Sequence, residues 1–175
     1  MKKFKKGYIQ VYTGDGKGKT TAAIGLAVRA AGAGLRVYIG QFLKRGGYAE
    51  LDGLKPLSRK IRIEQYGRGC LLRGKPSRQD IELARKGLAR AAEIIVSRKY
   101  DVVILDEINI APCLGLFRAK DIAGLMKLKP PDTELVLTGR GAPLCVLAKA
   151  HLVSDIRDKK HYYRRGVKAR RGIEN

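Results

Sequence analysis

The sequence predicts an α/β fold in which helices cover both faces of a mainly parallel β-sheet. Strand-like and helix-like segments alternate from one end of the 175 residues to the other, which is typical of such folds. A glycine-rich segment follows the first strand pattern and leads directly into a helix pattern. We therefore expect one domain, residues 1–175, with a basic C-terminal segment over residues 157–175.

Six segments have the composition of β-strands. Two of them contain the continuous apolar runs Val102-Val103-Ile104-Leu105 and Leu135-Val136-Leu137, as expected for strands that are buried on both faces. The six candidates span residues 8–13, 35–41, 61–66, 101–106, 133–138 and 151–155.

The clearest helix is expected over residues 77–98. Ser77 and Asp80 have the spacing of a capping box, and Pro76 marks the boundary before them. One apolar stripe follows at helical spacing. Its members are Ile81, Ala84, Leu88, Ala91 and Ile95.

The helix after the glycine-rich segment is expected to end near Gly32 and Gly34, which together suit a C-cap. Residues 42–60 and 67–76 are rich in glycine, lysine and arginine and show little periodicity. We interpret both as loops, and loops at strand ends commonly carry functional residues.

The glycine-rich segment reads Thr13-Gly14-Asp15-Gly16-Lys17-Gly18-Lys19-Thr20-Thr21. Its glycines allow backbone N–H groups to surround an anion at the positive end of a helix. Lys19 adds an ammonium for phosphate oxygens, and Thr20 offers a hydroxyl to Mg²⁺. A strict phosphate-loop pattern would have its first glycine at position 13, so this loop is a variant; the alternative is a turn that only caps the helix. With the alternating pattern, it predicts a three-layer P-loop nucleotide-binding fold of recombinase-like architecture.

Two carboxylates, Asp106 and Glu107, end the fourth predicted strand. In nucleotide-binding folds an acid in this place lies beside the metal that the loop binds. One of the pair is expected to hold Mg²⁺ directly or through water, and the other to orient it. The alternative is a pair of exposed carboxylates that cap the next segment.

Arg140 follows the fifth predicted strand between two glycines. From the same edge of the sheet it could reach a triphosphate or a substrate acid. It could equally bridge to a backbone carbonyl, and the sequence leaves both alternatives open.

The chain is strongly basic, with 37 lysines and arginines against 16 acidic residues and a net charge of +21. The excess gathers near the C-terminus and implies anionic partners. One interpretation is a nucleic-acid-binding tail. For a chain with a nucleotide loop we favour a basic surface around a cleft that binds a polyanion.

The three cysteines, Cys70, Cys113 and Cys145, are widely spaced and share no ligand spacing with the two histidines. We expect neither zinc nor disulfides, but three small buried side chains in a reducing compartment. No apolar stretch approaches the ~20 residues that a membrane span needs, and the start lacks the apolar core of a signal peptide. A cytoplasmic location is expected, without a membrane partner.

Five segments together resemble the ATP:corrinoid adenosyltransferases of cobalamin synthesis and salvage. The resemblance covers nearly the whole chain, and the shifted glycine of the loop is similar to the form found in that family. The matching segments are residues 13–23, Gln41-Phe42, residues 103–107, 137–141 and 166–174.

The resemblance implies that a Co(I) corrinoid attacks the 5′ carbon of ATP and that inorganic triphosphate leaves. It also implies Mg²⁺, a reductant such as a flavoprotein, and a homodimer. Thr20 and Glu107 would form the metal site, Lys19 and Glu107 would be catalytic, and Arg29 would contact the nucleotide. By spacing alone, Arg29 lies about three turns beyond Lys19 and suits a solvated helix face. The triphosphate cradle would comprise Gly14, Asp15, Gly16, Lys17, Gly18, Lys19, Thr20 and Thr21.

The chemistry agrees with this assignment, because a leaving triphosphate carries about four negative charges that loop amides, Lys17, Lys19 and Mg²⁺ can stabilise. One segment departs from the family. Members can present an aromatic pair after the third strand that displaces the lower axial ligand of the corrinoid, whereas this chain has Gly67-Arg68-Gly69-Cys70-Leu71-Leu72 and no tryptophan. Either Tyr66, Leu71 or Leu72 supplies an apolar wedge, or the corrinoid is handled differently.

Two hypotheses from other classes compete with the adenosyltransferase. The charge of +21 and the basic end suit a nucleic-acid-dependent ATPase of recombinase-like architecture. A nucleotide-binding regulator without turnover is the other. Only Tyr162 and Tyr163 lie within the charged tail, whereas single-strand binders interleave aromatic and basic residues, so a nucleic-acid partner is not favoured.

Overall fold

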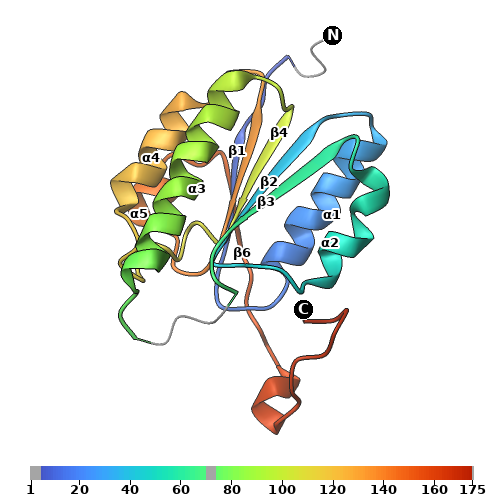
Figure 1. Ribbon diagram of the computed structural model, residues 1–175, viewed down its shortest axis with the longest axis vertical. Coiled ribbons are helices and arrows are strands. Elements are labelled where there is room, and N and C mark those ends of the chain that lie inside the picture. Colours follow the sequence, from blue (N-terminus) through green and yellow to red (C-terminus); the bar gives the residue numbers. More distant parts are fainter. Residues whose placement is uncertain (1–4, 70–73, 175) are drawn as a thin grey trace.

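A computed structural model describes residues 5–69 and 74–174 (Figure 1). Within these residues one sheet of six parallel strands has the order β3-β2-β4-β5-β1-β6. Each strand lies within two residues of its predicted bounds, so the predicted parallel sheet is confirmed. The strands are β1 Ile9–Thr13, β2 Val37–Phe42, β3 Ile61–Tyr66, β4 Val102–Asp106, β5 Glu134–Thr138 and β6 Leu152–Asp155.

Helices cover both faces of the sheet, which makes three layers (Figure 1). Helices α1 and α2 lie on one face, and α3, α4 and α5 lie on the other. The helices are α1 Lys19–Gly32, α2 Ala49–Gly53, α3 Arg78–Ser97, α4 Ala119–Leu128 and α5 Leu144–Leu147, with short 3-10 helices at η1 Lys55–Leu57 and η2 Tyr162–Arg165.

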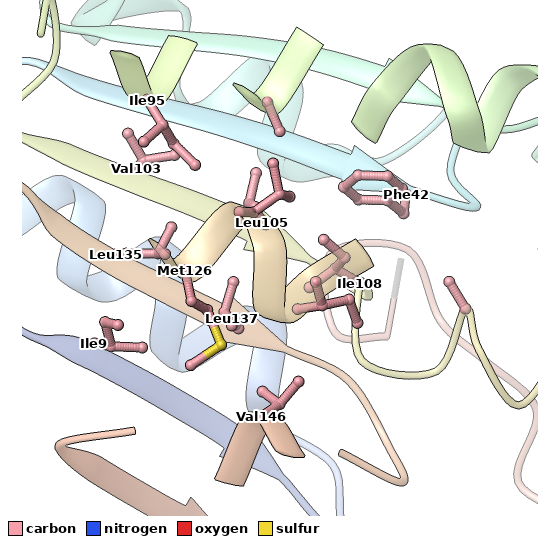
Figure 2. Packing of buried hydrophobic residues seen from close by; sticks show 14 of the residues in the cluster. Ile9, Phe42, Ile95, Val103, Leu105, Ile108, Met126, Leu135, Leu137 and Val146 are labelled. Atoms are coloured by element: carbon pink, nitrogen blue, oxygen red, sulfur yellow. The ribbon is translucent and has the colours of Figure 1, made fainter. Parts of the chain in front are cut away.

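The continuous apolar strands feed two separate cores because successive side chains point to opposite faces of a sheet. In β4, Val103 and Leu105 belong to the core under α3 and α4, where Figure 2 shows Val103 beside Ile95. Val102 and Ile104 belong to the core under α1. The strands are therefore buried on both faces, as their composition predicts.

Helix α1 packs on the sheet through small residues, Ala23, Ala27, Ala30 and Ala31. Small side chains allow the helix backbone to approach the strands closely. The helix ends in a Schellman motif, in which Gly34 N–H donates to Ala31 O at 2.8 Å and Leu35 N–H donates to Ala30 O at 2.9 Å. Gly34 has φ +80°, as its predicted capping role requires, whereas Gly32 is still helical.

Helix α3 begins as predicted. The Ser77 hydroxyl accepts from Asp80 N–H at 3.2 Å, and Asp80 Oδ2 accepts from Ser77 N–H at 2.9 Å, so both halves of the capping box are present. Arg68 also donates to the Asp80 carboxylate, at 2.8 and 3.0 Å. These donors lower the pKa of Asp80 to about 2, with Arg68 the largest cause.

Two expectations from the sequence are corrected. Residues 42–60 are not one loop, because α2 and η1 form there and Leu54 between them is buried in the core. Of residues 67–76, the structure describes 67–69 and 74–76, which form no helix or strand. Cys113 and Cys145 are exposed rather than buried. The reason at position 145 is that the short helix α5 turns Val146, not Cys145, into the core.

Cys70 lies outside the described residues. Over the two described ranges, no helix combines the length and the apolar character that crossing a membrane requires.

Gly87 offers a test of how α3 meets the sheet. A Cβ there would lie 2.6 Å from Cγ of the buried Tyr66, whose hydroxyl is held by Tyr38 and Glu64. We expect Gly87→Ala to destabilise the fold by about 2 kcal/mol, which lowers Tm by about 4–8 °C, although alanine favours helices.

Gly124 in α4 is the matched control, because nothing lies within 4 Å of a Cβ built there. Gly124→Ala should stabilise the fold by about 1 kcal/mol through helix propensity alone. Thermal unfolding followed by circular dichroism measures both, and equal Tm shifts would contradict the predicted contact.

Candidate functional site

A cleft of about 1360 Å³ opens at the carboxyl-end edge of the sheet. Parallel strands end there together, so side chains from distant parts of the sequence converge. The loop between β1 and α1, the ends of β4 and β5, the segment before α2 and the C-terminal segment all contribute to its lining. The predicted residues that line it are Gly14, Asp15, Gly16, Lys17, Gly18, Lys19, Thr20, Thr21, Glu107 and Arg140.

The glycines of the loop serve two different purposes. A Cβ at Gly14 would lie 2.3 Å from Ile156 O and one at Gly16 would lie 2.7 Å from the same oxygen, so both allow the C-terminal segment to approach. Gly18 has φ +120° and open space around its Cα, where the loop enters α1. A glycine is therefore needed at position 18 for its backbone conformation and not for a close contact.

Lys19 lies inside the loop with only 5% of its surface exposed. Its ammonium donates to Gly14 O at 2.7 Å and to Gly16 O at 2.6 Å. Burial lowers the pKa of Lys19, while the negative charge of Glu107 acts in the opposite direction. The loop thus has a cation at its centre and the N-terminus of α1 behind it, the arrangement of an anion site.

Asp106 at the end of β4 is almost completely buried and joins several elements. Its Oδ1 accepts from the hydroxyls of Thr20 at 2.9 Å and Thr138 at 2.6 Å. Its Oδ2 accepts from Gln41 Nε2 at 3.3 Å and lies 3.0 Å from Lys44 Nζ. Both oxygens are therefore engaged, and Asp106 orients the hydroxyl of Thr20.

Glu107 faces the cleft instead. Its backbone has φ +60°, a strained conformation for a side-chain-bearing residue, and its N–H donates to Thr138 Oγ1 at 2.9 Å. Within the part of the chain that the structure describes, its carboxylate accepts no hydrogen bond. Burial raises the pKa of Glu107, and the charge of Asp106 raises it further. A partly desolvated carboxylate without donors is suited to a cation.

The basic C-terminal segment forms one wall of the cleft, and we call residues 156–174 the C-terminal strap. Ile156 O accepts from Gly16 N–H at 2.8 Å, and Asp158 Oδ1 accepts from Lys17 N–H at 3.0 Å. The ammonium of Lys17 donates to Ile173 O at 2.8 Å. Lys17 therefore joins the loop to both ends of the strap.

The strap is also held to itself. Arg170 N–H donates to Glu174 Oε2 at 2.8 Å, Tyr162 donates to the same carboxylate, and the Arg170 guanidinium lies 4.9 Å from the centre of the Tyr162 ring. The donors lower the pKa of Glu174 to about 2, with Arg170 the largest cause. Figure 1 shows the strap continuing from β6 beyond the helical layers.

The two predicted arginines differ in position. Arg140 lines the cleft, with Nη1 3.9 Å from Asp15 Oδ1, and its contact with a bound anion stays a prediction. Arg29 lies in the last turn of α1, is exposed, and is not among the described residues that line the cleft.

Sequence reasoning missed Lys44, Gln41 and Thr138 as parts of the site. Gln41 and Thr138 were visible as polar residues at the ends of buried strands, which is the signal that could have found them. Lys44 lies in a segment without periodicity and offered none. The carboxylates of Asp106 and Glu50 outweigh the burial of Lys44 and raise its pKa.

Tyr66 does not face the cleft as a wedge. It is buried, and its hydroxyl lies 2.7 Å from the Tyr38 hydroxyl and 2.5 Å from Glu64 Oε2, so it belongs to the contact between β3 and α3. Of the three candidates for an apolar wedge, Leu71 and Leu72 remain, and both lie outside the described residues.

Residues 5–175 match the family described as ATP:corrinoid adenosyltransferase BtuR/CobO/CobP. The chain belongs to this family. The resemblance seen in the sequence is thereby confirmed over nearly its whole length, including the variant loop and the C-terminal strap.

Individual relatives agree with this membership. The corrinoid adenosyltransferase of Sinorhizobium sp. is 34% identical and that of Escherichia coli K12 is 32% identical; each match covers 97% of this chain and 80% or 86% of the relative. An uncharacterized protein of Nostoc sp., all2391, is 36% identical over 95% of this chain, and the chain spans about half (47%) of its length.

Among solved structures, the KaiC-like protein PH0186 of Pyrococcus horikoshii OT3 is similar, with a TM-score of 0.57 and 20% identity. The likeness covers 90% of this chain and 76% of that one. At this identity the likeness concerns the fold alone, and it confirms the predicted α/β fold for this adenosyltransferase family member.

The raised pKa of Glu107 has a consequence for stability. Above its folded-state pKa the carboxylate is charged in both states, and burial disfavours the charged form only in the folded state. We therefore expect Glu107→Gln, without metal or nucleotide, to raise Tm near neutral pH. The gain should shrink as the pH falls through the folded-state pKa toward 4.5, the ordinary value for glutamate.

Thermal unfolding across this pH range provides the measurement. Glu82→Gln is the control, because Glu82 is exposed on α3 and pairs with the exposed Arg78. It should change Tm little at any pH. A Glu107→Gln variant less stable than the parent near neutral pH would show that the buried charge is compensated.

A substitution of Lys17 tests how firmly the strap is held to the loop. Lys17→Met removes the hydrogen bond to Ile173 O and should accelerate tryptic cleavage within residues 157–171 about fivefold, the effect of one hydrogen bond on local opening. Mass spectrometry of the fragments gives the rate. Lys86→Met on the exposed face of α3 is the control, and equal rates in the two variants would contradict the contact.

Proposed function

We propose that this chain transfers the 5′-deoxyadenosyl group of ATP to the Co(I) of a corrinoid and releases inorganic triphosphate. Family membership supports the reaction. The observation that carries the proposal at the level of residues is the cleft in which the Lys19 loop faces the carboxylate of Glu107. In this reaction the bond between C5′ and its oxygen breaks, and cobalt supplies the electron pair of the new bond to carbon.

The loop is proposed to hold the triphosphate. N–H groups at the start of α1 and the ammonium of Lys19 lie where the negative charge of the leaving group would collect, and they are held before substrate binds. Arg140 adds a further cation at the rim. Lys17 contributes mainly by fixing the loop against the strap, since its ammonium already donates to Ile173 O.

Thr20 and Glu107 are proposed to hold Mg²⁺, with Asp106 orienting Thr20. A hydroxyl oxygen and an unpaired carboxylate are oxygen ligands of the kind that Mg²⁺ prefers. When bound, Mg²⁺ would neutralise charge on the triphosphate oxygens. Asp106 accepts a hydrogen bond from the Thr20 hydroxyl, which leaves the lone pairs of the Thr20 oxygen directed elsewhere.

The reaction requires little acid or base catalysis from the protein. The nucleophile belongs to the corrinoid and the leaving group departs as an anion, so the chain has to bind, orient and stabilise charge. The proposal also includes Arg29 as a nucleotide contact, a reductant that supplies Co(I), a homodimer and a cytoplasmic location. All four follow from the family resemblance or the composition.

The deciding experiment incubates the protein with ATP, Mg²⁺ and chemically reduced cobalamin. Triphosphate and adenosylated cobalamin are the expected products, followed by ion chromatography and by absorbance. The nucleic-acid-dependent ATPase would instead form ADP and orthophosphate, faster with DNA or RNA. A regulator would bind ATP and form neither set of products.

Lys19→Ala tests the residue in the centre of the loop. Loss of one charge-assisted contact to the leaving group should lower kcat/KM for ATP by at least ~100-fold. Lys149→Ala, on the exposed surface after α5, should leave it unchanged. A Lys19→Ala activity within about threefold of the parent would contradict the role of Lys19.

A further inference from the structure

Lys44 lies at the proposed metal site although nothing in the sequence pointed to it. Leu43, directly after β2, has φ +64°, which turns the chain across the edge of the sheet. Gly67 makes the turn possible, because a Cβ there would lie 2.3 Å from the carbonyl carbon of Leu43. The turn brings the Lys44 side chain over the end of β4.

The ammonium of Lys44 has four neighbours in this position. It lies 3.0 Å from Asp106 Oδ2 and 3.4 Å from Glu50 Oε1, and it donates to Thr20 Oγ1 at 3.5 Å. The ring of Tyr48 is centred 4.9 Å away. Only 13% of the Lys44 side chain is exposed, so these contacts are shielded from water.

The contact with Thr20 involves the same oxygen that the proposed metal needs. The Thr20 hydroxyl has one proton, which it donates to Asp106, and Lys44 donates to a lone pair of the same oxygen. A metal ion that binds to the Thr20 oxygen is therefore repelled by the ammonium of Lys44. Lys44 also lines the cleft, so that charge faces the loop that we assign to the triphosphate.

We propose that Lys44 is a resident cation of this site that disfavours a divalent ion alone and favours the ion only together with the triphosphate. The inference rests on the proposed function. Without nucleotide, Lys44 neutralises Asp106 and Glu50 and repels a divalent ion. With nucleotide, the triphosphate brings enough negative charge for both cations, so metal and nucleotide bind with positive coupling.

Two binding measurements on Lys44→Met test this, each with one charged probe. For Mn²⁺ alone, titrated by electron paramagnetic resonance, we expect about tenfold tighter binding than in the parent. For inorganic triphosphate with a chelator present, titrated by calorimetry, we expect about tenfold weaker binding. Loss of a positive charge should change the affinities for a cation and for an anion in opposite directions.

Three further variants make the result specific. Lys44→Gln retains a polar side chain without the charge and replaces Lys44→Met if that variant does not fold. Lys44→Arg retains the charge on a larger, planar group and should shift both affinities much less than Lys44→Met does. Lys60→Met makes the same substitution at a lysine that donates to Gly34 O, away from the cleft, and should change neither affinity.

The outcomes separate this inference from the proposed function. Affinities for both probes that fall together, or that stay within about twofold of the parent, would overturn the role of Lys44 and leave the reaction untouched. Thr20→Ala tests the metal site itself through Mn²⁺ binding in the presence of ATP. Unchanged binding there would overturn the proposed metal site whatever Lys44 does.

Discussion

The carboxylate of Asp106 is the contact on which the arrangement of the site depends. β1 and β4 are not neighbours in the sheet, since β5 lies between them. Asp106 spans this separation by accepting from Thr20 at the start of α1 and from Thr138 at the end of β5. A buried carboxylate is costly unless its oxygens are engaged, so these donors and Lys44 must stay in place for the loop to keep its position.

The phosphate loop is held by the strap as well as by the sheet. Ile156 and Asp158 accept hydrogen bonds from the N–H groups of Gly16 and Lys17, so the strap, which forms one wall of the cleft, satisfies these two donors. Gly14 and Gly16 make this possible because side chains there would overlap the strap. The loop is thus shaped before substrate arrives, which preorganised charge stabilisation requires.

The structure also shows where part of the positive charge of the chain lies. Basic residues of the strap and the loop surround a cleft whose proposed ligand carries several negative charges. This arrangement favours the interpretation of the basic C-terminus as part of the site. Within that positive field, Glu50, Asp106 and Glu107 supply the acidic groups that a metal and a resident lysine require.

The sequence by itself determined the strands, the loop, helix α3 with its cap, and the family, because each depends on residues adjacent in the chain or at a fixed period. Its residue pattern also indicated Asp106 and Glu107 as a pair, and the family resemblance singled out Glu107 for the metal. Only the tertiary structure decided that Asp106 is engaged, that Lys44 meets it, that Tyr66 is buried and that the strap contacts the loop. These contacts join residues separated by up to 156 positions, and backbone turns such as that at Leu43 set them, so no local pattern records them.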